Sequence, residues 1–308
     1  MNHSSVSVII PAYRAAHTIG QAVDSVLAQT TRPSEILIID DGSPDDMAAA
    51  VAPYGDQVIL IQKPNGGTAS ARNLGLDRAT GTMISFLDAD DYWEPDKIER
   101  QLKIFRDHPE VAFATGRYYH QHMGQPRSVR GLEGDGRFFG KISLTHGSEA
   151  FELARLIWTG TVMFPRSALG QNRFVSGLEP AEDLDLWIRL MADRPIYFDA
   201  EPLATWMLDA GSLSHSNLDK DCGNMLRVVR RNAAILGKQG LQFWESKTFK
   251  RWACNHLAQG RPRSAIKPAL SRLKRQPFAL DGWYTLIKSL AVAGRSPRSN
   301  QILEPISG

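Results

Sequence analysis

Four short apolar segments, separated by helical sequence, constrain the fold of this chain most strongly. They occupy residues 6–10, 36–39, 58–61 and 84–87. Short apolar runs bounded by turn-forming residues are typical of buried strands. The intervening segments are helical in pattern, as in residues 16–29, where apolar side chains recur every three or four positions. Strands that alternate with helices at this spacing predict an α/β fold with a mostly parallel sheet flanked by helices.

Two of these predicted strands end directly in carboxylates. Asp-Asp-Gly-Ser occupies residues 40–43 after the second strand, and Asp88, Asp90 and Asp91 follow the fourth. The carboxyl ends of parallel strands meet at the edge where open sheets bind ligands. Three close carboxylates repel one another unless a cation lies between them, and oxygen ligands favour a hard divalent ion. The pattern predicts a cation site, whereas a cap of the helix beginning near Pro95 is the alternative for an isolated Asp-x-Asp.

The second half of the chain changes character twice. Residues 120–147 are rich in glycine and arginine without periodicity, which predicts a long functional loop such as a lid. Apolar runs then predict strands at 158–164 and 195–198 around a helix at 183–191, and residues 217–294 are wholly helical in pattern. We expect the following organisation: a domain of residues 1–214 with halves 1–117 and 118–214, a helical region of residues 215–294, and a disordered tail of residues 295–308.

Charge is distributed unevenly along the chain. The overall net charge is +3, but residues 215–308 hold 17 lysines and arginines against 5 acidic residues, whereas residues 1–214 hold 19 against 28. A basic helical region predicts contact with an anionic surface such as a membrane, and a solvated basic face is the alternative. Nothing in the sequence indicates nucleic-acid binding.

Features of cellular location are few. No apolar stretch approaches the roughly 18 residues of a transmembrane helix, and the N-terminus lacks the basic and apolar regions of a signal peptide. The two cysteines, Cys222 and Cys254, are not in metal-binding or redox spacing. These features predict a cytoplasmic protein that can be peripheral on the inner face of a membrane.

Five motifs follow one another in order between residue 6 and about residue 214. They are Val-Ser-Val-Ile-Ile-Pro-Ala-Tyr at 6–13, Asp-Asp-Gly-Ser at 40–43, Asn-x-Gly-x3-Ala-Arg-Asn-x-Gly at 65–75, Asp-Ala-Asp at 88–90 and Glu-Asp at 182–183. An ordered series is far more specific than any one of its motifs. The series resembles the family 2 glycosyltransferases with the GT-A fold, which use nucleotide-diphosphate sugars.

The resemblance implies a nucleotide-binding role for five residues. Asp41 is implied to accept a hydrogen bond from uracil or an equivalent base, and Pro11 and Tyr13 to enclose that base. Arg72 is implied to contact the nucleotide, and Asp88 to meet the ribose.

The resemblance also implies residues for the chemistry. Asp90 would be the direct ligand of Mn2+ or Mg2+, which bridges the two phosphates of the donor. Asp183 matches the general base of inverting members, and Asp185 is its competitor within the same segment. Trp158 and Glu182 would lie on the acceptor side.

One segment departs from the family pattern. Many relatives have Tyr-Arg-x-His-x-Gly-Ser-x-Ser where residues 206–214 read Trp-Met-Leu-Asp-Ala-Gly-Ser-Leu-Ser. Met207 therefore replaces the arginine and Asp209 the histidine. Asp209 could be a second metal ligand, while His215 or arginines of residues 120–147 could help to hold the diphosphate.

The resemblance implies an inverting, metal-dependent enzyme that transfers a single sugar from a nucleotide-diphosphate sugar, most simply a UDP-sugar, to a saccharide or lipid-linked acceptor. Surface polysaccharide, lipopolysaccharide or glycan assembly is the expected context. Two alternatives stay open, a sugar-nucleotide-binding subunit without turnover and a nucleotidyltransferase. The sequence at residues 11–15, Pro-Ala-Tyr-Arg-Ala, disfavours the second because it lacks a glycine-rich phosphate loop.

Overall fold

The computed structural model describes residues 4–122, 124–140, 144, 148–192, 194–208 and 217–295. Its strands are β1 (Val6–Ala12), β2 (Glu35–Asp40), β3 (Ile59–Gln62), β4 (Met83–Phe86), β5 (Tyr92–Trp93), β6 (Ala114–His122), β7 (Ser128–Arg130), β8 (Arg137–Phe139), β9 (Met163–Pro165) and β10 (Ile196–Leu208). Its helices are α1 (Ile19–Leu27), α2 (Met47–Val51), α3 (Thr68–Arg78), α4 (Lys97–Asp107), α5 (Ser148–Leu156), α6 (Arg166–Leu169), α7 (Glu182–Met191), α8 (Leu218–Arg231), α9 (Ala233–Ala258), α10 (Pro262–Arg275) and α11 (Leu280–Arg295). Two 3-10 turns are η1 (Ala52–Gln57) and η2 (Thr159–Thr161).

All the strands join one sheet in the order β3-β2-β1-β4-β9-β6-β10-β5, with β7 paired to β6 and β8 to β10. The strands β3, β2, β1 and β4 run parallel, as the sequence predicts. Beyond β4 the sheet is mixed, since β9 is antiparallel to β4 and β6 whereas β6 and β10 are parallel. The predicted α/β class is confirmed, with the parallel arrangement concentrated in the first half.

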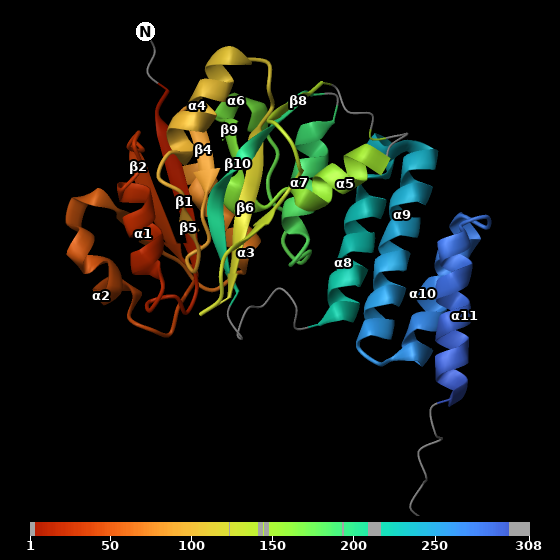
Figure 1. Cartoon of the computed structure of the whole chain (residues 1–308). Helices are drawn as coiled ribbons and strands as arrows, with labels where there is room; N and C mark the ends of the chain where they lie inside the picture. The colour runs from red at the N-terminus through yellow and green to blue at the C-terminus, as the bar shows by residue number, and fades with distance from the viewer. Residues whose placement is uncertain are drawn as a thin grey trace, which may run out of the picture.

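Helices cover both faces of the sheet (Figure 1). Alternate residues of β1 separate the two layers, because Val8 and Ile10 pack with α1, α2 and α4 whereas Ile9 packs with α3 and α7. Gly75 on α3 permits a particularly close approach, since a Cβ atom there would lie 2.3 Å from Cγ2 of Ile9. The glycine of the third motif therefore seats α3 tightly against the sheet, one turn away from Arg72.

The segment 120–147 is more ordered than its composition predicts. The β6 strand continues to His122, and β7 and β8 form antiparallel pairs with β6 and β10. The prediction of an aperiodic loop was therefore wrong for these strands. All three residues of β7 are exposed, so its backbone hydrogen bonds form without the apolar alternation that would have identified it.

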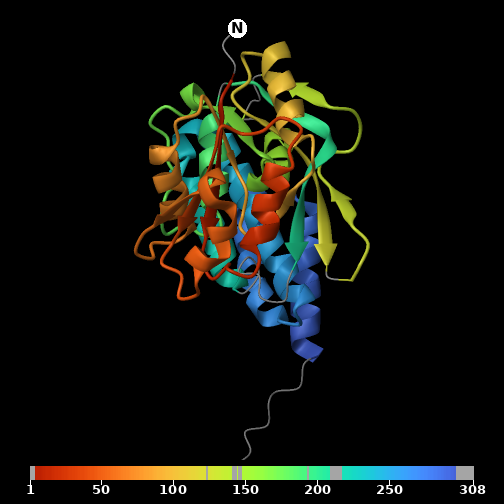
Figure 2. The ribbon, with the colours of Figure 1, turned by 90° about the vertical axis from the view of Figure 1, so that its left-hand side faces the viewer.

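Helices α8 to α11 lie side by side, extending away from the sheet beyond α7 (Figure 1), and the view turned by 90° places them behind it (Figure 2). Val228 and Val229 of α8 and Trp244 of α9 belong to the same apolar cluster as α7. Asp185 of α7 is fully buried and accepts hydrogen bonds of 2.8 Å from Arg189 and from Asn232. The helical region is thus anchored to the helix that carries Asp183. In the described residues, no helix is sufficiently long and apolar to span a bilayer.

Candidate active site

Residues of the first four motifs lie together at one edge of the sheet. Pro11 lies near the end of β1, Asp41 directly follows β2, and Asp88 lies just beyond β4. Since β2, β1 and β4 are parallel neighbours, their carboxyl ends bring these residues to the same edge. The sequence argument predicts this convergence, and the register of the strands produces it.

Asp41 organises the loop before α3. It is buried, and its carboxylate accepts hydrogen bonds from the backbone N–H groups of Gly66 at 3.0 Å and Gly67 at 2.7 Å, and from Lys63 Nζ. Gly67 has a φ of 84°, a conformation that suits glycine. Oδ1 receives two of these hydrogen bonds and Oδ2 only that of Gly67, so Oδ2 keeps a lone pair for a further donor.

Lys63 is a site residue that sequence reasoning missed. It reaches Asp41 because β3 pairs with β2, and its own N–H donates to the Asp40 carbonyl at 3.0 Å. The side chain is largely buried. No motif spacing announces this contact, which depends on the register between two strands.

Tyr13 is exposed at the end of β1, and the guanidinium of Arg14 lies 5.4 Å from the centre of its ring. Arg14 has a positive φ of 55°, and its N–H donates to Ser43 Oγ at 3.1 Å. The loop after β1 is therefore tied to the motif after β2. Pro11 is half-buried and is the second-last residue of β1, directly before this loop region.

Arg72 is buried and connects two acids that are distant in sequence. Nη2 donates to Asp88 Oδ1 at 2.7 Å, and Nη1 donates to Glu182 Oε1 at 2.9 Å. Its guanidinium also lies 5.4 Å from the ring centre of Phe174. Burial acts to lower the pKa of Arg72, but the charges of Asp88 and Glu182 together outweigh it and raise the pKa, so the guanidinium is a fixed positive charge.

The three acids after β4 have different environments. The Asp88 side chain is partly exposed while it binds Arg72, and Asp90 is exposed. Asp91 is buried and accepts a hydrogen bond of 2.8 Å from the Met207 N–H. Burial and the charges of Asp90 and Asp88 raise the pKa of Asp91 well above its ordinary value. Asp91 therefore joins β4 to the end of β10, and the exposed carboxylate is that of Asp90.

A divalent cation fits this edge on chemical grounds. Among the described residues, no group of three or more histidines, cysteines and acids is arranged to hold a metal ion. Mg2+ retains several water ligands and binds proteins through one or two carboxylates together with substrate phosphates. Asp90 could supply such a carboxylate. The possible second ligand, Asp209, lies outside the described residues, as does His215.

Glu182 and Asp183 begin α7 at the other side of Arg72. The Asp183 carboxylate accepts from its neighbour's N–H, that of Leu184, at 2.6 Å and from Thr159 Oγ1 at 3.3 Å. Burial raises the pKa of Asp183 although Arg72 opposes that shift. Burial also raises the pKa of Glu182 to about 7, against the effect of Arg72 and assisted by the charge of Asp183.

One carboxylate oxygen of Glu182 accepts no hydrogen bond from the described residues. Its Oε2 is buried, and no hydrogen-bond partner for it occurs within the described part of the chain. A buried carboxylate oxygen without a partner beside a raised pKa is typical of a functional site. By contrast, both carboxylate oxygens of Asp185 accept hydrogen bonds, one from Arg189 and the other from Asn232.

Trp158, which the resemblance implies to be on the acceptor side, is packed within an aromatic cluster. Trp158 is buried and stacks on Trp206, with ring centres 5.8 Å apart and an interplanar angle of 12°. The ring centre of Tyr118 lies 5.0 Å from that of Trp158 and 6.3 Å from that of Trp206. Trp158 thus supports Trp206, a half-buried residue that sequence reasoning did not select for this side.

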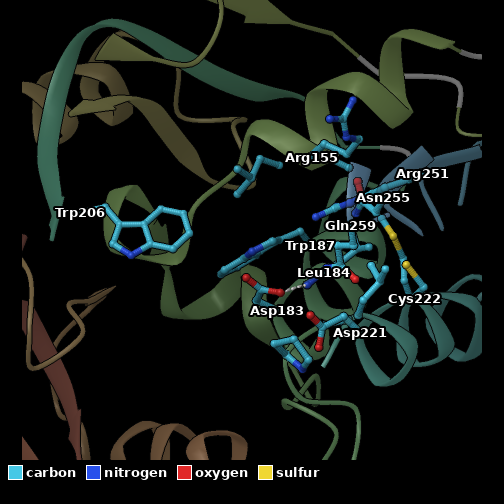
Figure 3. A pocket seen from close by; sticks show the side chains of 16 residues that line it. Arg155, Asp183, Leu184, Trp187, Trp206, Asp221, Cys222, Arg251, Asn255 and Gln259 are labelled. Atoms are coloured by element: carbon cyan, nitrogen blue, oxygen red, sulfur yellow. Dashed lines mark hydrogen bonds between the residues drawn. The ribbon is translucent and has the colours of Figure 1, made fainter. Parts of the chain in front are cut away.

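A pocket of about 420 Å³ opens beside Asp183 (Figure 3). Its walls come from α5, α7, α8 and α9, together with Trp206 from β10. Asp183 and Trp206 therefore face a cavity formed jointly by the sheet domain and the helical region.

The comparisons with known proteins agree with this geometry. The model of a family described as "Glycosyl transferase family 2" matches residues 7–170. An uncharacterised glycosyltransferase of Rickettsia prowazekii is 32% identical over 222 residues, a match that covers 70% of this chain and 67% of that protein. The match to a Rickettsia typhi relative covers 62% of that protein, and the match to a Rickettsia conorii relative 39%.

One relative is named for its activity: WfgD of Escherichia coli, a UDP-Glc:α-D-GlcNAc-diphosphoundecaprenol β-1,3-glucosyltransferase. It is 32% identical over 200 residues, which cover 64% of this chain and 73% of WfgD.

Two solved structures share the fold. Residues 1–349 of S. aureus TarS in complex with UDP-GlcNAc align with a TM-score of 0.66 at 15% identity, over 96% of this chain and 93% of that one. The mannosyltransferase PcManGT of Pyrobaculum calidifontis, in complex with GDP-Man and Mn2+, aligns at 0.58 and 19% identity, over 96% and 82%. The chain therefore belongs to glycosyl transferase family 2 and is a glycosyltransferase with the GT-A fold.

Proposed function

We propose that this glycosyltransferase is inverting and metal-dependent, and that it transfers one sugar from a UDP-sugar to a hydroxyl of a saccharide or lipid-linked acceptor. The observation that carries the proposal is the position of Arg72, which holds Asp88 of the donor edge and Glu182 beside Asp183 at the same time. The donor and acceptor sites would then lie on either side of the buried guanidinium of Arg72. The complexes of TarS with UDP-GlcNAc and of PcManGT with GDP-Man support a nucleotide-sugar donor.

The donor would bind along the edge formed by β2, β1 and β4. The base would lie between Tyr13 and the loop of Gly67, and donate its imide N–H to Oδ2 of Asp41. The ribose would meet Asp88, whose carboxylate is already oriented by Arg72 at 2.7 Å. The loop before α3 would not have to change conformation, because Asp41 holds it in place through the hydrogen bonds from Gly66 and Gly67.

Asp90 would hold Mn2+ or Mg2+ beside the diphosphate. When bound, such an ion neutralises the negative charge that develops on the leaving diphosphate. The Mn2+ in the PcManGT structure supports a divalent ion as the cofactor. The chain supplies few carboxylates of its own here, so the donor phosphates and water would complete the coordination.

Asp183 would act as the general base. The acceptor oxygen attacks C1 from the face opposite the nucleotide, its proton passes to an oxygen of Asp183, and the C1–O bond to the diphosphate breaks to release UDP. Thr159 and the Leu184 N–H hold the carboxylate in position for this transfer. The raised pKa of Asp183 makes it a stronger base than a solvated aspartate, provided the pH is high enough to deprotonate it.

The proposal extends to the cell envelope. WfgD acts on a lipid-linked acceptor, which supports assembly of a surface polysaccharide or related glycan on the cytoplasmic side of a membrane. In this chain, α11 and the turn before it expose a stripe of large apolar side chains, with exposed fractions of 94% for Phe278, 84% for Leu280 and 62% for Ile287. Trp283 and Tyr284, which suit the interface between headgroups and acyl chains, lie on the same exposed stripe.

The partner of this stripe would be an anionic membrane surface. The surrounding helical region is strongly basic, with 17 lysines and arginines against 5 acids over residues 215–308. Apolar and aromatic anchors combined with basic residues are the composition of helices that lie in the plane of a membrane. Contact through α11 would bring the enzyme to a lipid-linked acceptor.

A donor screen tests the function. UDP-, GDP- and TDP-sugars are incubated with the full chain, with and without Mn2+, and nucleotide release and thermal unfolding are measured. We expect one UDP-sugar to be hydrolysed and to raise Tm only with the metal, and Asp90→Asn to lose both effects. Stabilisation without any nucleotide release would instead favour a binding subunit without turnover. Absence of both effects for every sugar nucleotide would refute the proposal.

A further inference from the structure

The pocket beside Asp183 is built from one face of each of several helices. Arg251 and Asn255 are four positions apart on α9 and Gln259 follows four positions later, directly after the last residue of the helix, so the three form a single polar stripe. Asp183 and Trp187 come from α7 on another wall. The helical region thus contributes side chains directly to the surroundings of the proposed base, beyond its role as a support.

The polar groups of the pocket are divided between two ends (Figure 3). Asp183 and Asp221 lie toward one end, whereas Arg155 and Arg251 lie toward the other with the amide of Asn255. Apolar side chains line the walls between them, including Leu184. A ligand that fits both ends carries a hydroxyl at one end and a negative charge at the other.

Trp187 and Arg251 of the pocket are a donor and a cation for which the described residues provide no hydrogen-bond acceptor and no ion-pair partner, respectively. Trp187 is fully buried in its wall, and its indole N–H has no hydrogen-bond partner within the described chain. Arg155 is paired with Glu152 at 2.5 Å, but Arg251 forms no ion pair with any carboxylate of the described residues. A guanidinium at a pocket wall, together with neighbouring amides, is suited to a phosphate group.

We propose that this pocket binds the acceptor, and that the acceptor is a glycoside with a phosphate-containing anchor, bound by Arg251 and the amides of Asn255 and Gln259. Its attacking hydroxyl would lie at Asp183 and its apolar tail along the walls of the pocket. A cavity of about 420 Å³ is within the range of roughly 300–1,000 Å³ that holds small-molecule ligands. This inference rests on the proposed glycosyl transfer for the role of Asp183, while the anion site stands on the pocket itself.

Binding of farnesyl diphosphate, as a short polyprenyl diphosphate, tests the anion site without knowledge of the acceptor sugar. The full chain is titrated in the presence of saturating UDP and Mn2+, so that the donor site is occupied, and binding is measured by calorimetry. Farnesol and inorganic diphosphate are titrated in parallel. We expect farnesyl diphosphate to bind at least about tenfold more tightly than either, because the site matches both charge and tail.

Substitution of the proposed anion ligand then locates the site. Arg251→Gln should weaken the binding of farnesyl diphosphate at least about tenfold, because one hydrogen bond to a charged group is lost. Arg263→Gln, which removes an exposed arginine of α10 outside the pocket, should leave affinity unchanged within about twofold. The UDP-sugar hydrolysis rate should be unaltered in Arg263→Gln, because Arg263 lies neither in the pocket nor at the edge formed by β2, β1 and β4.

The possible outcomes separate this inference from the proposed function. Absence of saturable binding, equal binding of farnesol, or equal affinity in wild type and Arg251→Gln would overturn the anion site even if the donor is hydrolysed. Weakened binding in Arg251→Gln with no turnover of any sugar nucleotide would support the anion site and refute the transfer reaction. Weakening by Arg251→Gln and Arg263→Gln alike would show nonspecific charge attraction and overturn the assignment.

Discussion

Nη1 of Arg72 donates a 2.9 Å hydrogen bond to Oε1 of Glu182, a residue 110 positions later in the chain. The other terminal nitrogen of the same guanidinium holds Asp88, at the end of the strand that leads to the proposed metal ligand. Arg72 thereby fixes the distance between the donor edge and the acid pair at the start of α7. Its own position depends on α3, which Gly75 seats closely against β1.

Replacement of Arg72 by lysine should impair catalysis severely. A lysine retains the charge but cannot donate in two directions from a planar group, so one of Asp88 and Glu182 loses its partner. We expect Arg72→Lys to lower kcat/KM by at least about tenfold, because hydrogen bonds to charged groups contribute roughly 1.5–3 kcal/mol. Steady-state kinetics of sugar transfer would measure this decrease in kcat/KM. Arg78→Lys, at an exposed position of the same helix, is the matched control; an equal effect of both variants would contradict this role.

The Glu182–Asp183 pair should set the acid limb of the pH–rate profile. A general base with a raised pKa is protonated at low pH, so kcat/KM should rise with pH through the range near 7 in which Glu182 titrates. Glu182→Gln removes a negative charge next to Asp183. It also leaves the positive charge of Arg72 less neutralised, and both effects favour the ionised form of Asp183. The limb should therefore move to lower pH.

This shift is measured by kcat/KM across pH 5 to 9, in roughly half-unit steps chosen to span the titration. Glu201→Gln, at an exposed glutamate of β10, provides the control and should leave the limb in place. If the acid limb of the Glu182→Gln variant coincides with that of the wild type, or lies at higher pH, then this pair does not control the ionisation of the base.

Lys97 should make the stability of the fold depend on pH. It is fully buried, where Nζ donates to Ser85 Oγ at 2.8 Å and Gln101 Oε1 at 2.7 Å and lies 4.0 Å from the ring centre of Trp93. Burial lowers its pKa well below 10.5. The unfolded chain therefore binds one more proton than the folded chain between that lowered pKa and 10.5, so the contribution of Lys97 to stability increases with pH in this window and is lost as pH falls.

The comparison with Lys97→Met isolates this effect. The free energy of unfolding of wild type minus that of the variant should increase with pH, by at most about 1.4 kcal/mol per pH unit. Urea unfolding at pH 7 and at about pH 9 measures the difference, and Lys103→Met on the exposed side of α4 should show none. A difference that is constant or decreases with pH would contradict the buried, depressed amine.

The exposed stripe of α11 should bind anionic membranes. We expect the full chain to sediment with vesicles of mixed phosphatidylglycerol and phosphatidylethanolamine but less with phosphatidylcholine, and salt to reduce the binding. Replacement of Phe278 and Ile287 by serine should reduce binding at least about fivefold, because each side chain loses a contact of roughly 1 kcal/mol or more with the acyl region. Ile59→Ser, on a comparably exposed isoleucine of β3, is the control.

Size-exclusion chromatography with light scattering identifies the competing outcome. If the stripe instead joins two copies of the chain, the wild type should be a dimer and the Phe278 and Ile287 double variant a monomer, with vesicle binding weak in both. That result would contradict the membrane assignment.

The sequence is a good guide to the first half of the sheet and a poor one to contacts between its halves. Apolar runs predict β1 to β4, and acids at strand ends predict the edge where they gather. The contacts of Lys63 with Asp41 and of Arg72 with Glu182 depend on strand register and on the packing of α7, which no local pattern encodes. The surroundings of Asp183 and Asp185 differ for the same reason, because Asn232, between α8 and α9, donates a hydrogen bond to Asp185.

The effect of Asp183→Asn on transfer and on donor affinity is the most direct test of the account. Asparagine keeps the shape of the side chain and removes its capacity to accept a proton. We predict that kcat for transfer falls by roughly 10²–10⁴, the usual contribution of a general base, while the Kd for the UDP-sugar with Mn2+ changes by less than about threefold. A variant that retains more than about half of the wild-type kcat would contradict Asp183 as the base of this glycosyltransferase.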